Sequence, residues 1–260
     1  MQKFGKQMEI GMRWLSCGWR LFLRNPWQLT GMGLTAAVVV GVLMIVPLVG
    51  TLLIALLAPA LLGSGYLAAD ALARQKMALP PQLRLPAFTH APKEFLRVFG
   101  HESRVMPTIV ACFFSMAVAL LVSILVRAIA GNAWVAGWSD LAVGPLLAVL
   151  GAGLLALLVY ALLTASLIYA LPLAFLQDEP LLPALGRSLT ASFGQLFALL
   201  AVFGLLLAAL LFTTIAAQLS VWVGALAWLI AGTVVLPVVV TALYCSYRTV
   251  FTVREAARAA

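Results

Sequence analysis

Six long apolar runs dominate the pattern of hydrophobic and polar positions in this sequence. They cover residues 29–49, 51–70, 105–130, 141–176, 196–219 and 221–247. A helix needs about 20 apolar residues to cross a hydrocarbon core about 30 Å thick, and each run supplies them. None alternates apolar and polar residues as barrel strands do. Because backbone N–H and C=O groups in lipid must be bonded within the protein, the runs predict an all-α membrane protein with six transmembrane helices.

The fourth run is longer than one perpendicular crossing requires. A helix over residues 141–176 would be about 54 Å long at about 1.5 Å per residue. Two interpretations fit this length: a strongly tilted helix that extends beyond the membrane, or a short piece that stops near Gly151 and is followed by one span. No polar turn divides the run, so it does not contain two full spans.

The runs group into three hairpins, each preceded by an amphipathic helix. The breakers between Pro47 and Gly50 separate the first two runs, and a turn near Gln218 to Ser220 separates the last two. Apolar stripes at helical spacing precede the hairpins: Ile10, Trp14, Cys17 and Leu21, then Phe95 and Phe99, then Leu185, Leu189, Phe193 and Leu196. Cations lie beside these stripes, as expected for helices that lie along an anionic membrane surface.

The three units match one another weakly in sequence, which predicts a pseudo-threefold repeat within one membrane domain of residues 1–260. The units cover approximately residues 8–73, 92–178 and 183–253. The second helix of each contains a proline: Pro59, Pro172 and Pro237. Tyr66 and Tyr244 each follow the proline of their unit by seven residues. The alternative is that apolar sequences built from few residue types align by chance.

Composition and charge agree with a membrane location and set the orientation. The chain is 64% hydrophobic and 9% charged, with a mean hydropathy of +1.11, whereas soluble domains have about 25% charged residues. Fifteen of the sixteen lysines and arginines fall on one side of the predicted spans, and Arg127 alone falls on the other. The positive-inside rule therefore places both termini in the cytoplasm, as a multi-pass protein of the bacterial cytoplasmic (inner) membrane. The net charge of +8 then indicates anionic lipids as partners and not nucleic acid.

One stretch carries a family resemblance. Residues 175–180, Phe-Leu-Gln-Asp-Glu-Pro, and 184–188, Ala-Leu-Gly-Arg-Ser, resemble a run in uncharacterised bacterial multi-pass inner-membrane families, in which a short acidic connection precedes an amphipathic helix and a hairpin. The membrane domain fused to some glycerophosphodiester phosphodiesterases is similar in this layout. The resemblance covers the helical layout of the whole chain and implies a membrane location without an activity. Mitochondrial carriers share the layout, but their charged signature is absent after Pro59 and Pro237.

Few residues in the chain are suited to chemistry. Asp70 lies four residues before Arg74, which predicts a helical ion pair, with a proton or ligand site as the alternative. Arg127 and Asp140 flank the outer turn, where mutual neutralisation is expected and a periplasmic anion site is the alternative. His90 and His101 lack metal-ligand spacing. No nucleophile, base and acid can be combined, so neither an enzyme nor a cofactor is expected.

Cysteines, glycines and prolines receive structural interpretations. Cys17, Cys112 and Cys245 are expected to be small buried thiols, since no Cys-x-x-Cys spacing occurs. Glycine pairs are expected to allow close helix contact, namely Gly31 and Gly33, Gly63 and Gly65, and Gly151 and Gly153. Pro59, Pro172 and Pro237 each remove a helical hydrogen bond at a matching place, as in transporters with broken helices.

Two functional hypotheses remain. The first is a non-enzymatic accessory or scaffold component with a membrane-protein partner, favoured by the lack of ionisable groups inside the spans. The alternative is a carrier or lipid-handling protein for an apolar or amphipathic substrate, suggested by the repeat and its prolines. A lined cavity in the bundle would favour the second hypothesis, and a packed centre the first.

Overall fold

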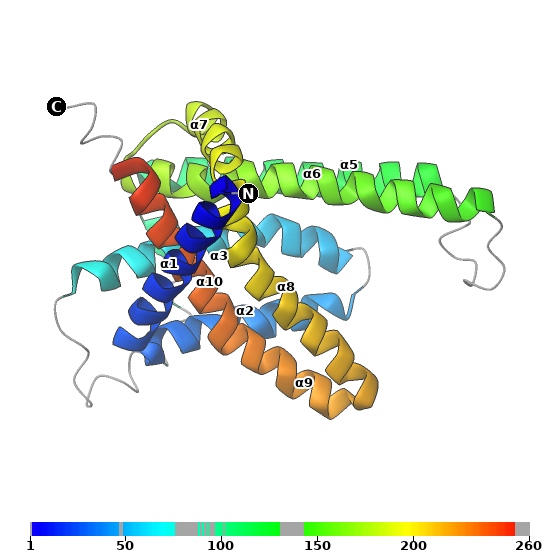
Figure 1. Ribbon diagram of the computed structural model, residues 1–260, viewed down its shortest axis with the longest axis horizontal. Helices are drawn as coiled ribbons and strands as arrows, with labels where there is room; N and C mark the ends of the chain where they lie inside the picture. Colours follow the sequence, from blue (N-terminus) through cyan, green and yellow to red (C-terminus); the bar gives the residue numbers. More distant parts are fainter. Residues whose placement is uncertain are drawn as a thin grey trace.

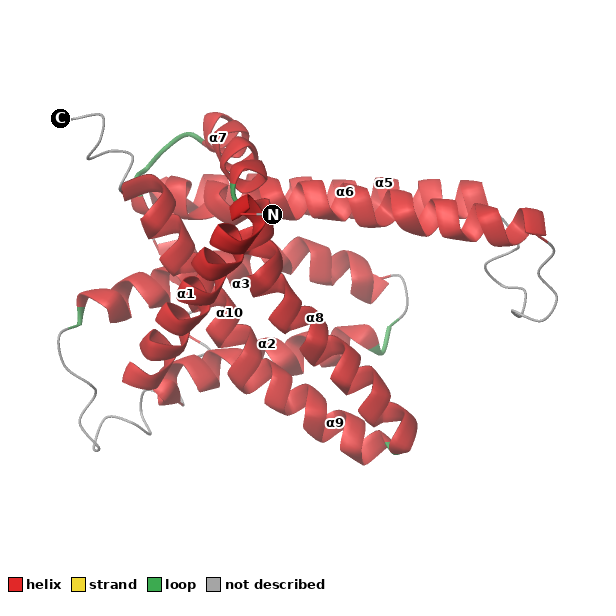
Figure 2. Ribbon diagram, viewed as in Figure 1, coloured by secondary structure: helices red, strands yellow, loops and turns green. Residues whose placement is uncertain are grey.

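The computed structural model describes residues 2–46, 49–75, 88, 90, 93, 97–100, 102–130 and 143–252, and all regular structure in these residues is helical (Figures 1 and 2). The α-helices are α1 (Gln2–Arg24), α2 (Pro26–Met44), α3 (Val49–Arg74), α5 (Glu102–Ala130), α6 (Val143–Leu176), α7 (Leu181–Gly194), α8 (Leu196–Leu219), α9 (Val221–Ile230) and α10 (Leu236–Tyr247). Arg97–Gly100 forms the 3₁₀ turn η2, and Ala231–Val235 and Arg248–Thr252 form the π-helical turns η5 and η6.

Six helical segments are long and apolar enough to cross a membrane, as the sequence predicted. They are Pro26–Met44, Val49–Arg74, Arg104–Ile129, Leu150–Leu176, Leu196–Leu219 and Val221–Phe251. The first begins three residues before the predicted run, because Pro26 occupies the first turn of α2, where its missing N–H costs nothing. The sixth is composed of α9, η5, α10 and η6 in succession.

The long fourth run forms one continuous helix, α6, with no break at Gly151. Its 34 residues give a length of about 51 Å at about 1.5 Å per residue. Figure 1 shows that α6 runs beside α5 and that this pair extends well beyond the ends of α2, α3, α8 and α9. At Gly151 and Gly153 of α6 nothing lies within 4 Å of the place that a Cβ would occupy, so the predicted close helix contact at these two glycines is wrong.

The buried core lies where α3, α6 and α10 meet, towards the end of the bundle that carries Arg74, Arg104 and Arg248. We call this end the cation-rich end; it is on the left in Figure 1. Its largest fully buried side chains include Tyr66, Tyr169 and Phe175. Apolar side chains on the outer faces are exposed along all the spanning helices, as expected for a surface in contact with lipid.

Helix α1 packs along α10 through the stripe that the sequence predicted. Trp14 and Leu21 are buried, and Gly18 lies so close to Ala242 that a Cβ at Gly18 would overlap the α10 backbone. The Thr241 hydroxyl donates to the carbonyl of Gly18 at 3.1 Å. The amphipathic pattern of α1 is therefore used for packing against another helix.

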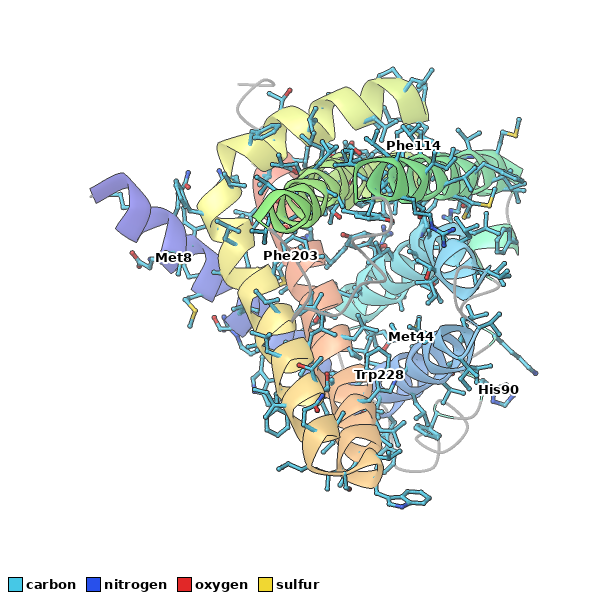
Figure 3. All side chains as sticks on the ribbon, turned by 90° about the vertical axis from the view of Figure 1, so that its right-hand side faces the viewer. Met8, Met44, His90, Phe114, Phe203 and Trp228 are labelled. Atoms are coloured by element: carbon cyan, nitrogen blue, oxygen red, sulfur yellow. A yellow bond between two sulfur atoms is a disulfide. The ribbon has the colours of Figure 1, made fainter. Side chains whose placement is uncertain are left out.

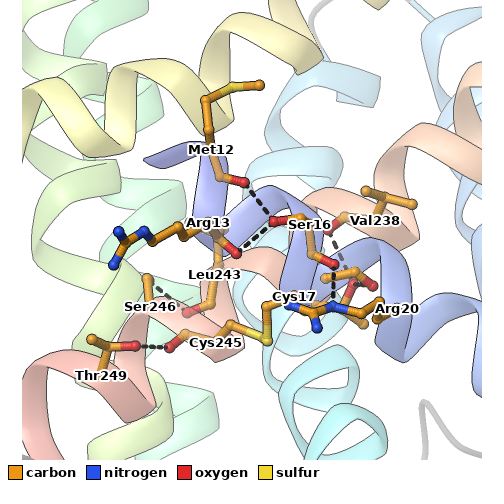
Figure 4. Close-up of a disulfide and its surroundings, with 12 residues drawn as sticks. Met12, Arg13, Ser16, Cys17, Arg20, Val238, Leu243, Cys245, Ser246 and Thr249 are labelled. Atoms are coloured by element: carbon orange, nitrogen blue, oxygen red, sulfur yellow. Dashed lines mark hydrogen bonds between the residues drawn. A yellow bond between two sulfur atoms is a disulfide. The ribbon is translucent and has the colours of Figure 1, made fainter. Parts of the chain in front are cut away.

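A disulfide joins the same two helices. Cys17 of α1 is bonded to Cys245 of α10, with 6.4 Å between their Cα atoms (Figure 4). The expectation of three free thiols is thus wrong for this pair and right for Cys112, which is free and buried. The pairing escaped the sequence because the two cysteines are 228 residues apart and only the docking of α1 on α10 brings them together.

Helix α7 forms where predicted, and the face that it packs against the protein is not the predicted apolar stripe. The expected stripe of Leu185, Leu189, Phe193 and Leu196 is partly or largely exposed, and Phe193 is 56% exposed. The buried face carries Ala184, Ser188, Ala191 and Ser192 and packs on α6. Small residues form the contact with α6 because they allow the two helices to approach closely. Large apolar residues gain little free energy from packing against protein when the alternative is contact with lipid.

Ser188 is inserted into the hydrogen bonding of α6. The Tyr169 N–H donates to Ser188 Oγ at 3.0 Å, and this hydroxyl donates to the carbonyl of Ala165 at 2.9 Å. Ser192 donates to the same carbonyl at 2.8 Å. The two serines thus fasten α7 to α6 through backbone groups that the protein interior would otherwise leave poorly satisfied.

The second predicted surface helix falls largely outside the described residues, which omit 94–96 and 101; Arg97–Gly100 forms the short η2 turn. The threefold repeat therefore remains a prediction.

Candidate functional site

An apolar cavity of about 280 Å³ lies between α2, α3 and α10, inside the spanning part of the bundle. Its wall consists of apolar residues and glycines: Leu29, Met32, Gly33, Ala36 and Val40 of α2; Ile54, Ala58, Leu61, Leu62 and Gly65 of α3; and Leu236, Pro237 and Val240 of α10. The wall offers no side-chain hydrogen-bond donor or acceptor.

Small residues account for both the contact between these helices and the space between them. A Cβ at Gly33 would overlap the carbonyl of Gly232 in η5, and one at Gly232 would overlap Ala37, so α2 and η5 touch through their backbones. Gly65 lies similarly close to Val240. Ala36 and Ala58 then line the cavity with single methyl groups, which leaves the volume open. Trp228 of α9 joins α2 next to the wall residue Ala36, where its indole N–H donates to the carbonyl of Ala37 at 3.1 Å (Figure 3 labels Trp228).

The structure separates the three predicted prolines. Pro59 and Pro172 are buried within α3 and α6, which continue through them as α-helices. Pro237 lies in the first turn of α10, directly after the π-helical turn η5, and lines the cavity. Of the three prolines, only Pro237 lies where the helix changes from π-helical to α-helical, and this change occurs at the cavity wall.

A polar cluster lies beyond the cavity at the cation-rich end. The predicted ion pair is formed: Arg74 Nε lies 2.8 Å from Asp70 Oδ2. The Tyr244 hydroxyl of α10 donates to the other carboxylate oxygen, Asp70 Oδ1, at 2.8 Å. Arg248 lies near the same hydroxyl. We call Asp70, Arg74, Tyr244 and Arg248 the Asp70 cluster.

Tyr244 connects this cluster to the cavity wall. It follows Val240 by four residues and Pro237 by seven, so the three side chains share one face of α10. The seven-residue spacing between Pro237 and Tyr244 was visible in the sequence. The contact between Tyr244 and Asp70 was not, because the two residues are 174 positions apart and belong to different helices. The sequence predicted Arg74 as the partner of Asp70 and missed Tyr244.

Asn25 is a second polar residue near this end of the cavity. It joins α1 to α2, four residues before the wall residue Leu29, and is only 2% exposed. Neither its amide oxygen nor its amide nitrogen has a hydrogen-bond partner among the described residues. A buried amide without partners is costly, so a ligand atom or a water molecule would be stabilised beside it.

The other candidate residues do not contribute to this site. Arg127 lies on the extended part of α5 with an exposed side chain. Asp140, its predicted partner, lies outside the described residues, so that pairing remains a prediction. In the described part of the chain, no group of three or more His, Cys, Asp or Glu side chains could hold a metal ion.

Comparisons with protein-family models, curated proteins and solved structures give no match.

Proposed function

We propose that this chain is a non-enzymatic, lipid-handling protein of the bacterial cytoplasmic membrane that holds an acyl chain in the cavity between α2, α3 and α10. The observation that carries the proposal is the purely apolar wall of a cavity lying within three spanning segments. This favours the lipid-handling hypothesis over a scaffold with a packed centre.

An acyl chain is the occupant that matches the cavity's size, wall and surroundings. A water molecule needs two to four polar partners, which the wall does not supply. An apolar cavity of about 150 Å³ can accept a benzene molecule, so about 280 Å³ is enough for several methylene groups. The solvent around these helices is lipid, which supplies such groups at high concentration.

The proposed orientation puts the cation-rich end in the cytoplasmic leaflet. It rests on the fifteen-to-one division of lysine and arginine along the chain. The Asp70 cluster then lies at headgroup depth, and the cavity extends from there into the hydrocarbon core.

The scaffold role remains the second candidate because α5 and α6 extend past the other helices. Leu121 and Ile124 of α5 and Leu154 and Leu157 of α6 are exposed. A partner within the membrane would find an accessible helix pair there.

The test is the amount of lipid that the protein retains after purification in mild detergent. Ala58→Phe places an aromatic ring in the cavity and should reduce the bound lipid per protein at least about tenfold. A benzene ring fills an apolar cavity of about 150 Å³, so the phenylalanine ring would occupy about half of this one. Ala36→Leu fills the cavity from the opposite wall and should act in the same direction. The matched control is Ala208→Phe on the exposed face of α8, which should retain lipid as the wild type does.

Lipid should be identified by native mass spectrometry, with thermal melting as the measure of folding. If both cavity variants fold and keep the wild-type amount of lipid, the cavity is not the binding site. If the wild type carries no lipid but carries a stoichiometric protein partner, the scaffold hypothesis replaces this one.

A further inference from the structure

We infer that the Asp70 cluster is the headgroup site of the cavity, and that it selects a lipid with an anionic phosphate headgroup. This inference rests on the proposed function, because it names the class of lipid whose acyl chain the cavity holds.

The cluster is placed where a headgroup would follow an acyl chain. Along α3 it begins five residues after the wall residue Gly65, which is about 7.5 Å of helix. Along α10 it begins four residues after Val240, which is about 6 Å. Both helices run towards the cation-rich end at this point, so the cluster lies at the end of the two helices where a headgroup would be expected (Figure 1).

The charges of the cluster favour an anion. The cluster contains two guanidinium groups and one carboxylate, so the sum of its own formal charges is +1. Asp70 is engaged on both oxygens, by Arg74 and by Tyr244, and its side chain is only 19% exposed. A cationic headgroup would therefore have to displace an existing bond to reach the carboxylate.

Arg74 is suited to bind a phosphate while it keeps its bond to Asp70. It contacts Asp70 through Nε, and its terminal nitrogens make no hydrogen bond to any residue that the structure describes. Its side chain is 75% exposed at the cation-rich end. A planar guanidinium that is oriented by one carboxylate can donate from its remaining edge to phosphate oxygens.

Tyr244 acts as the positioning residue. Its hydroxyl donates to Asp70. The tyrosine thus fixes the carboxylate that orients Arg74. Substitution of Tyr244 by phenylalanine should weaken selection of the headgroup without filling or emptying the cavity.

The test compares lipids that differ only in the headgroup. Delipidated protein in detergent is titrated with phosphatidylglycerol or with phosphatidylcholine of identical acyl chains, and binding is followed by native mass spectrometry. The wild type should bind phosphatidylglycerol about tenfold more tightly, the effect of one charge-assisted hydrogen bond. In Arg74→Gln/Arg248→Gln binding of both lipids should weaken, because both carry a phosphate, and the preference should fall to about one, because the cluster no longer repels the choline cation. Tyr244→Phe should give an intermediate preference.

The matched control is Arg20→Gln, an exposed cation on α1 that should leave the preference intact. An equal preference in the wild type and the double variant would overturn the headgroup site. In that case a continued effect of Ala58→Phe on both lipids would leave the acyl-chain proposal standing, so the two failures are distinguishable. A separate measurement compares thermal unfolding of the protein in the presence of glycerol phosphate and of the whole lipid. If glycerol phosphate protects the protein as strongly as the lipid does, the site binds a soluble phosphate and the lipid assignment is wrong.

Discussion

Tyr244 of α10 and Asp70 of α3 form a 2.8 Å hydrogen bond that links two spanning helices at the cation-rich end of the bundle. Tyr244 is 3% exposed, and Asp70 is bonded at the same time to Arg74. The bond therefore joins α3 to α10 through a buried side chain.

Two tyrosine substitutions should have opposite consequences. Tyr244→Phe removes a hydrogen bond to a charged group, and we expect it to lower the free energy of unfolding by about 1.5–3 kcal/mol. The Tyr66 hydroxyl is fully buried and has no hydrogen-bond partner among the described residues. Tyr66→Phe should therefore be neutral or slightly stabilising. Thermal melting of both variants in one detergent makes the comparison, and an equal loss in the two would contradict it.

The disulfide should stabilise the docking of α1 on α10. Reductant should lower the unfolding free energy of the wild type by about 2–4 kcal/mol, in the usual range for a cross-link. Cys17→Ser should melt at the lower temperature with or without reductant. Cys112→Ala is the control, because Cys112 is free, and its protein should keep the response to reductant. A wild type that melts identically in both conditions would show that the bond adds no stability.

Ser188 should matter more than a neighbouring hydroxyl of the same helix. Ser188→Ala leaves the buried Tyr169 N–H without its acceptor, and we expect a loss of about 1–3 kcal/mol. Thr190 donates only to the carbonyl of Gly186 on the exposed side of α7, so Thr190→Ala should change stability by no more than about 0.5 kcal/mol. Chemical or thermal unfolding would show whether α7 is fastened through Ser188.

The proposed orientation can be tested with impermeant thiol reagents in intact cells. In a background with Cys17→Ser, Cys112→Ala and Cys245→Ser, a cysteine at Asn132 should be labelled and one at Gln82 should be shielded. Labelling at Gln82 would reverse the orientation.

The candidate site was only partly predictable. The Asp70–Arg74 pair follows from four-residue spacing on one helix, and the sequence showed that Pro237 and Tyr244 lie seven residues apart. Neither observation indicated a cavity. Its wall is made of apolar and small residues that look alike wherever a helix crosses a membrane, whether they face lipid, a neighbour or an empty volume.

The sequence by itself determined the six spanning helices, since the transfer of a helix into lipid depends on the residues of that helix alone. It also determined which ends carry the cations. Only the tertiary structure decided that Cys17 meets Cys245, that Tyr244 meets Asp70, and that α7 packs on α6 through Ser188. The physical reason is that packing between helices in lipid has no hydrophobic driving force to mark the contacting face. Close approach and hydrogen bonding select that face instead, and both depend on the partner helix.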